Sequence, residues 1–131
     1  MISKADLLKI ARGRLKDAEV LLAAGRYDGA IYLGGYVVEI ALKHRICKTL
    51  KWSGFPQTNR EFQGYQSFKT HDLDILLSLS GVEVKIRTNY FAEWSTVIIW
   101  DPEIRYNLIG STSKAAAERL IKAAQKLLMV L

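Results

Sequence analysis

The side chains best suited to chemistry lie in residues 100–113, which read WDPEIRYNLIGSTS. Arg105 and Tyr106 stand side by side in this segment, between an Asp-Pro opening and Gly110. We expect Asp101 to cap a short helical turn that begins at Pro102. A guanidinium remains protonated at physiological pH, so Arg105 could hold a phosphate group and stabilise negative charge that develops on it. The same property makes arginine a poor proton shuttle. A reaction at this segment therefore needs a second residue that exchanges protons.

Few residues could move that proton. Histidine is the usual choice near neutral pH, and the chain has only His44 and His71, both of which precede Arg105. His71 opens the helix-like stretch HDLDILLSLS, and Tyr106 adjoins the arginine. We therefore treat Arg105 with either His71 or Tyr106 as the candidate catalytic set. The alternative for His71 is a purely local contact at the start of its helix.

Arg105 also has a structural interpretation, because Glu39 lies among apolar residues of the stretch 27–52. A buried carboxylate without a partner is costly. We expect an ion pair between Arg105 and Glu39, which makes Glu39 a structural partner of the candidate site. The alternative is a pair between Glu39 and Lys43, which stand four residues apart on one helix.

The basic residues are concentrated in the first part of the chain. The formal net charge is +6 and the isoelectric point about 9.5. Residues 1–53 carry ten Lys or Arg against five Asp or Glu. A basic cluster ends the second helix-like stretch and comprises Lys43, Arg45, Lys48 and Lys51. These four residues are candidates for binding nucleic acid, and the alternative is a solvated helix end.

Other common sites find no support in the sequence. The glycines of YLGGY lie within a helical pattern and lack the Lys-Ser/Thr ending of a phosphate-binding loop. Two isolated histidines and Cys47 are too few for a zinc site. No Ser-His-Asp arrangement can be argued from these positions. We therefore expect neither a metal nor a cofactor.

The sequence also bears on the cellular compartment. No charge-free apolar run approaches the roughly 18 residues that cross a bilayer, so we expect no membrane partner. Charges are spread through the apolar positions of MISKADLLKIARGRLK, unlike a secretory signal. Cys47 is the only cysteine, which precludes an internal disulfide. These features predict a cytoplasmic protein.

The periodicity of apolar residues predicts an all-α fold in one domain, residues 1–131. Helices are expected from a Ser3 cap to Gly25, over 27–52, from a Thr70 cap to Gly81, and through 117–131. Residues 82–100 fit both a strand and a helix, and we favour the helix. The result is an antiparallel up-and-down bundle of four to five helices with one long loop, 53–69.

Two further features concern packing. Small residues on the 27–52 helix, among them Ala30, Gly34 and Ala41, permit a close approach of another backbone, either inside the bundle or across a dimer. The 53–69 loop is rich in aromatic residues. These aromatic side chains could stack on nucleobases, and we favour packing onto the end of the bundle.

Three segments together resemble a HEPN domain. They are ARGRLKDAEVLLAAGRYDGAIYLGGYVVEIALK, THDLDILL and the Arg-Tyr turn before an alanine-rich last helix. The resemblance covers the chain except for the 53–69 loop, and it implies a helical bundle that is commonly dimeric. It also implies a minimal nucleotidyltransferase as partner in a toxin–antitoxin pair. Active HEPN domains are metal-independent ribonucleases that use an Arg followed four to six residues later by a His.

Arg105 matches the arginine of that motif by position, but no histidine follows it. The sequence therefore leaves three hypotheses. The first is a catalytically reduced HEPN-like module that binds RNA or a nucleotidyltransferase partner. The second is an unconventional metal-independent ribonuclease that uses Arg105 with His71 or Tyr106. The third is a structural dimerisation module.

Overall fold

The first long helix is fixed at both ends by local chemistry. In a computed structural model that describes all 131 residues, a short strand, β1 (Ile2–Ser3), leads into α1 (Lys4–Ala23). The Ser3 hydroxyl accepts a hydrogen bond from the backbone N–H of Asp6, as an N-cap does. Gly25 has a φ of 75°, a conformation that glycine adopts at little cost, and the chain reverses there. Both predicted ends of this helix are confirmed.

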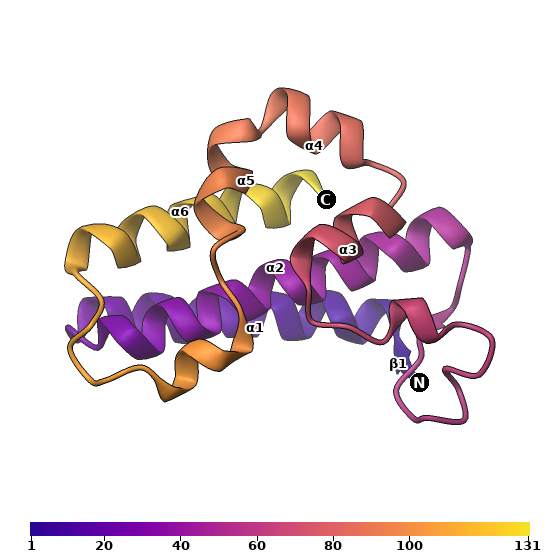
Figure 1. The fold of residues 1–131 in the computed structure, drawn as a ribbon, viewed down its shortest axis with the longest axis horizontal. Coiled ribbons are helices and arrows are strands. Elements are labelled where there is room, and N and C mark those ends of the chain that lie inside the picture. The colour runs from indigo at the N-terminus through magenta and orange to yellow at the C-terminus, as the bar shows by residue number, and fades with distance from the viewer.

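The second helix, α2 (Tyr27–Leu50), is the centre of the fold and contacts α1, α3 and α6 (Figure 1). Its glycines serve contacts within the chain. A Cβ at Gly34 would lie 2.7 Å from Leu120 Cδ2, and a Cβ at Gly35 would overlap the indole of Trp100. The small-residue face is therefore covered by α6 and by Trp100. It does not supply the dimer contact that it could have supplied.

The segment after α2 closes one end of the bundle. Strand β2 (Gly54–Phe55) pairs with β1 in antiparallel register, with Ile2 opposite Phe55. A 3₁₀ turn, η1 (Gln66–Phe68), precedes α3 (Leu73–Leu79). Phe55 and Phe62 are buried, so part of the aromatic loop packs onto the bundle end as predicted. The N-cap of α3 is Asp72 rather than Thr70, because the Asp72 carboxylate accepts from Ile75 N–H.

Residues 82–100 are helical, as favoured from the sequence. They form two seven-residue helices, α4 (Glu83–Asn89) and α5 (Phe91–Val97). A 3₁₀ turn, η2 (Pro102–Tyr106), follows, and the last helix is α6 (Lys114–Val130). Ser113 caps α6 by accepting a hydrogen bond from Ala116 N–H.

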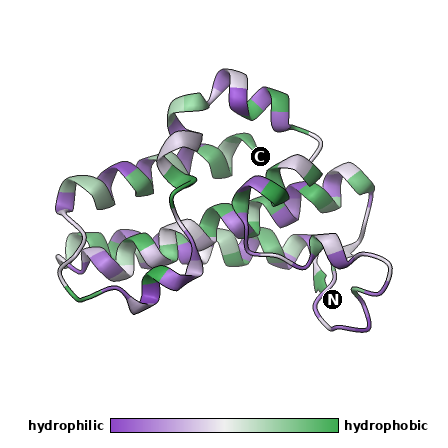
Figure 2. Cartoon of the chain, viewed as in Figure 1, coloured by the Kyte–Doolittle hydropathy of each residue, from purple (hydrophilic) through white to green (hydrophobic).

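The three long helices pack side by side, and α3, α4 and α5 lie over them (Figure 1). α1 runs opposite to α2, whereas α6 runs in the same direction as α2 because the segment 98–113 carries the chain back to the start of α2. Apolar residues recur along each long helix with polar ones between them (Figure 2). The all-α bundle is confirmed, with six α-helices and two 3₁₀ turns. None of the helices is both long and apolar enough to cross a membrane.

Candidate functional site

One face of α2 carries a row of polar and aromatic side chains. Tyr32, Tyr36, Glu39 and Lys43 are spaced by four, three and four residues, which places them on a common helical stripe. The start of α3 and the segment around Trp100 lie against this stripe, as the contacts of His71 and Trp100 with Tyr36 indicate. The stripe therefore collects residues from three parts of the chain.

Glu39 anchors the site. Its side chain is 3% exposed, and its two oxygens are 2.9 Å from Lys43 Nζ and 2.9 Å from His71 Nδ1. Lys43 is half-buried and lies over the Phe55 ring. The predicted pair between Arg105 and Glu39 is therefore wrong, and the alternative with Lys43 is correct. Two cationic or hydrogen-bonding partners already satisfy the buried carboxylate.

The contact with Glu39 also orients His71. A hydrogen bond from Nδ1–H to a carboxylate fixes the tautomer and leaves Nε2 available. The His71 side chain is 61% exposed, so its free nitrogen is accessible to a ligand. The contact of His71 with Glu39 joins two helices, so the alternative of a purely local contact at a helix start is wrong. A carboxylate behind an exposed imidazole is an arrangement suited to acid–base chemistry.

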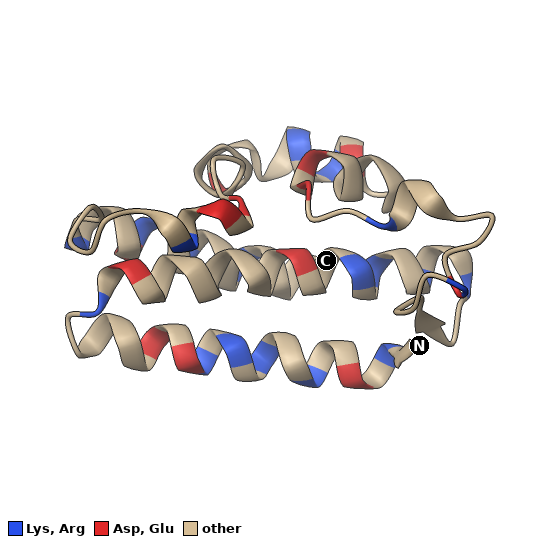
Figure 3. Ribbon diagram, turned by 60° about the horizontal axis from the view of Figure 1, so that its bottom comes forward, with Lys and Arg blue, Asp and Glu red and all other residues tan.

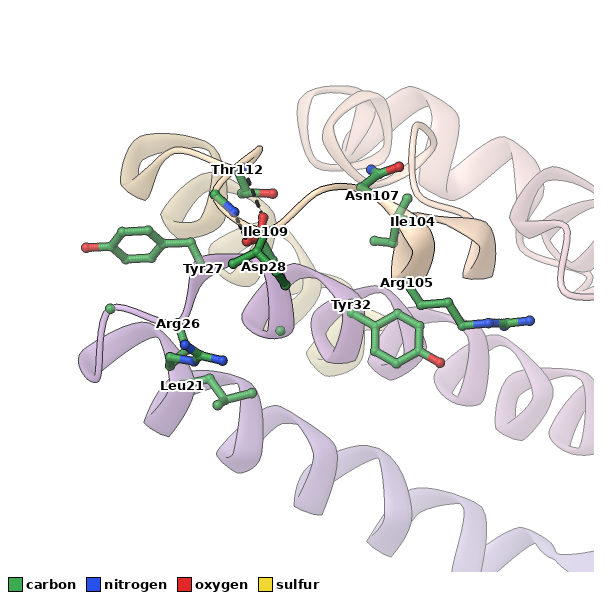
Figure 4. Close-up of a pocket in the computed structure, with 13 residues that line it drawn as sticks. Leu21, Arg26, Tyr27, Asp28, Tyr32, Ile104, Arg105, Asn107, Ile109 and Thr112 are labelled. Carbon is green, nitrogen blue, oxygen red and sulfur yellow. Dashed lines mark hydrogen bonds between the residues drawn. The ribbon is translucent and has the colours of Figure 1, made fainter.

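Arg105 extends from the η2 turn. The Asp101 carboxylate accepts from Glu103 N–H, so Asp101 caps the turn that Pro102 begins, as the sequence predicts. The guanidinium of Arg105 lies 4.7 Å from the centre of the Tyr106 ring and 3.9 Å from Glu103. The side chains of Tyr106, first, and Tyr32 raise its pKa. Figure 4 shows this guanidinium pointing away from Asp28 and past Tyr32.

His71 and Arg105 line the same cavity. Its volume is about 470 Å³, and Trp100 and Asp101 form part of its wall. Four carboxylates also border it, those of Asp72, Asp74, Asp101 and Glu103. Asp72 and Asp101 are N-caps, and Asp74 is paired with Arg87. The cavity thus combines an exposed imidazole and a guanidinium with acidic walls.

Tyr36 connects the groups around this cavity. Its ring makes edge contacts with Trp100, Tyr32 and His71, at centroid distances of 4.9, 5.3 and 6.5 Å. Burial, first, and a hydrogen bond with Tyr32 raise the pKa of Tyr36 to about 12. The phenol therefore holds its proton more tightly than an ordinary tyrosine and can donate a hydrogen bond.

A second cavity of about 360 Å³ adjoins Arg105 on its other side, between the start of α2 and residues 104–112 (Figure 4). Asp28 holds this segment in place. Its carboxylate accepts hydrogen bonds from Gly110 N–H at 2.7 Å and from Thr112 N–H at 3.0 Å. The Gly110 bond, first, and those of Thr112 lower the pKa of Asp28. Asp28 thereby fixes the chain that carries Arg105 and Tyr106.

The structure places Lys43 apart from the other members of the predicted nucleic-acid cluster. Lys43 is bound to Glu39, and a residue two positions on, Arg45, points to a different side of α2 and is half-buried. Lys48 and Lys51 are exposed. Helical geometry separates Lys43 from the set, whereas Arg45 and Lys48 stand three residues apart and share a side of α2. Nucleic-acid binding by these residues stays a prediction.

Sequence reasoning missed three residues of the site, Asp28, Tyr32 and Tyr36, as functional positions. The regular spacing from Tyr32 to Lys43 was the available signal for the tyrosines, whereas nothing local indicates that Asp28 binds a segment more than eighty residues away. No three His, Cys, Asp or Glu side chains are arranged to hold a metal ion. Comparisons with protein-family models, curated proteins and solved structures find no match to this chain.

Proposed function

We propose that this chain is a HEPN-like module that binds RNA at the cavity shared by His71 and Arg105 and cleaves it without a metal ion. The observation that carries the proposal is the convergence of these two residues, with the buried Glu39 behind the imidazole. Arg105 supplies a fixed positive charge, and His71 supplies the proton exchange that arginine cannot. The histidine comes from the start of α3 rather than from the residues after Arg105.

The proposed reaction is an internal transesterification. His71 Nε2 removes the proton of a ribose 2′-hydroxyl, and the resulting oxygen attacks the adjacent phosphorus. The bond from phosphorus to the 5′-oxygen breaks, which leaves a 2′,3′-cyclic phosphate. Arg105 stabilises the negative charge on the phosphoryl oxygens. The leaving oxygen takes a proton from the phenol of Tyr106, which adjoins Arg105.

The second candidate function is a catalytically reduced module that binds RNA without cleaving it. The acidic walls of the cavity favour this reading, because Asp72, Asp101 and Glu103 oppose the approach of a phosphate to His71. In that case Arg105 contacts phosphate and the Glu39–His71 contact is structural. The two candidates differ in one measurable property, cleavage.

The remaining proposals rest on the resemblance. They are a homodimer, a minimal nucleotidyltransferase partner, a toxin–antitoxin or RNA-regulatory setting, and a location in the cytoplasm. A structural dimerisation module is the last alternative. Its support is limited to the exposed apolar side chains of residues 99–109, since the glycine face of α2 is buried within the chain.

RNA cleavage in the presence of EDTA tests the proposed function. We expect purified protein to convert a labelled single-stranded RNA into fragments that end in a 2′,3′-cyclic phosphate. His71→Asn should lower the rate by about 10²–10⁴-fold, the range for loss of an acid–base group. Thr88→Ala, at an exposed position on α4 outside the cavity, is the control and should cleave as wild type does. RNA that is bound but left intact selects the second candidate, and RNA that is neither bound nor cleaved rejects both.

A further inference from the structure

The outer side of the helix pair α1 and α2 carries basic residues that have no acidic partner. Of the eight ion pairs in the structure, none includes a member of this set. We call the set the α1/α2 basic surface, and it consists of Lys4, Lys9, Arg12, Lys16, Arg45 and Lys48. Figure 3 shows Lys and Arg spaced along α1, with Asp and Glu among them.

The part of the chain that contains this surface carries most of the positive charge. Residues 1–53 hold ten Lys or Arg against five Asp or Glu, whereas residues 54–131 hold nine against eight. The first part therefore supplies five of the six surplus positive charges.

The pKa of His44 indicates that cations of both helices lie close enough to act on the same residue. It lies half-buried on α2, and its pKa is lowered by burial, first, and then by Lys48, Lys4, Arg12 and Arg45. Two of these cations belong to α1 and two to α2. Arg45 is a second residue of this surface without a partner, because its Nε atom is buried and makes no hydrogen bond.

None of the three carboxylates on α1 forms an ion pair with a member of the surface. Asp17 is paired with Arg14, which is not part of the surface. Asp6 and Glu19 make no ion pair. A surface with a concentrated charge of one sign attracts a ligand of the opposite sign and with several charges.

We propose that the α1/α2 basic surface binds the phosphodiester chain of a single-stranded RNA. The inference rests on the proposed function for the identity of the ligand, and it assigns a path for the RNA outside the cavity of His71 and Arg105. The large apolar side chains that α1 and α2 expose are Ile10, Val20 and Leu50, none of which offers a ring for a base to stack on, so the surface contacts phosphates and not bases. Binding along it is independent of nucleotide sequence.

The salt dependence of binding tests the surface. The probe is a fluorescent 2′-O-methylated oligouridine, which has no 2′-hydroxyl to react, so binding is measured without cleavage. The test variant replaces Lys4, Arg12, Lys16 and Lys48 with Gln, all of them exposed. The control variant replaces Arg60, Arg119, Lys122 and Lys126 with Gln, which removes the same charge elsewhere. Circular dichroism melts of both variants establish that they are folded.

Each phosphate contact on a single strand contributes a slope of about −0.7 to log K against log salt concentration. The test variant should therefore lose up to about 3 units of slope, whereas the control keeps the wild-type slope. An equal loss in both variants would mean attraction by net charge alone and would overturn the proposal. Binding of the wild type to vesicles of anionic lipid but not to the oligonucleotide would overturn it as well.

Protonation of His44 on RNA binding gives the surface a second test. Because phosphates counter the four cations around His44, binding raises the pKa of this residue, and affinity should increase as pH falls from about 8 to about 6. His44→Gln should abolish this increase, whereas His71→Gln should retain it. A pH dependence that disappears only in His71→Gln would overturn the role of His44. Absence of cleavage by the wild type, with the slopes intact, refutes the proposed catalysis and leaves the surface standing.

Discussion

Glu39 is the residue on which the candidate site depends for its order. Its carboxylate is buried and holds both Lys43 and His71 at 2.9 Å. In Glu39→Gln the amide cannot pair with the Lys43 ammonium, and this charge is left half-buried. We expect a loss of about 2–3 kcal/mol in the free energy of unfolding, typical of hydrogen bonds to charged groups and at the low end for a buried pair. Urea denaturation measures it.

Arg105→Ala is the control for the stability loss expected of Glu39→Gln. Arg105 is exposed and makes no contact with Glu39, so its replacement should leave the unfolding midpoint unchanged while RNA binding decreases. A midpoint shift as large as that of Glu39→Gln would show that Arg105 has a structural role after all. The sequence suggested such a role because Glu39 required a partner. It could not show that Lys43 and His71 supply two.

At the scale of elements, the position of η2 depends on a close contact with α2. The Trp100 indole lies against Gly35 and donates a hydrogen bond from Nε1 to the Tyr32 carbonyl at 3.2 Å. A methyl group at Gly35 would overlap this ring, so Gly35→Ala should destabilise the protein by about 1–3 kcal/mol, or more if the backbone cannot adjust. Thermal unfolding followed by circular dichroism measures the effect.

Gly13→Ala makes the same chemical change as Gly35→Ala, and we expect the opposite effect on stability. A Cβ at Gly13 meets open space on the exposed side of α1. Alanine should therefore stabilise the protein by about 0.5–1 kcal/mol, through its higher helix propensity. Equal effects of the two substitutions would mean that Trp100 is not packed against Gly35 in solution.

The segment 107–112 is held by one carboxylate, and this hold depends on pH. The hydrogen bonds of Asp28 lower its pKa from 3.8, so their contribution is fully present above that pH and is lost as pH falls through the lower folded value. Asp28→Asn should speed amide hydrogen exchange at Gly110 and Thr112 at neutral pH. The control Asp6→Asn should not change this exchange. Unchanged exchange in Asp28→Asn would show that the Asp28 hydrogen bonds do not hold the segment.

Local features were the most predictable from sequence. The Ser3 cap, the turns at Gly25 and Gly81 and the Asp101–Pro102 start of η2 follow from short-range rules and are confirmed. Contacts between distant segments were not predictable. Gly110 binds Asp28 and His71 binds Glu39 because the chain returns to α2 twice, and only the packing of η2 and α3 against that helix defines those pairs.

At the scale of the whole molecule, the bundle could be predicted and its surfaces could not. The spacing of apolar residues indicates which residues of α2 are buried. It does not indicate whether α6 or a second chain covers Gly34. The structure assigns this face to α6. The direction of α6 depends likewise on residues 98–113, whose irregular pattern specifies no path. Any dimer must therefore use a different surface from the one that the sequence suggested.

Light scattering can test the homodimer on that basis. Exposed apolar side chains gather in the segment that carries Arg105, where Ile99, Leu108 and Ile109 are each at least 80% exposed. Such residues are costly to leave in water when they lie together. We expect twice the 14.8 kDa mass for the wild type and a monomer for Leu108→Ser/Ile109→Ser. The control Val84→Ser/Met129→Ser, also at exposed apolar positions, should remain dimeric. A wild type of 14.8 kDa at micromolar concentration would reject the homodimer, and dissociation by the control alone would move the interface to α4 and α6.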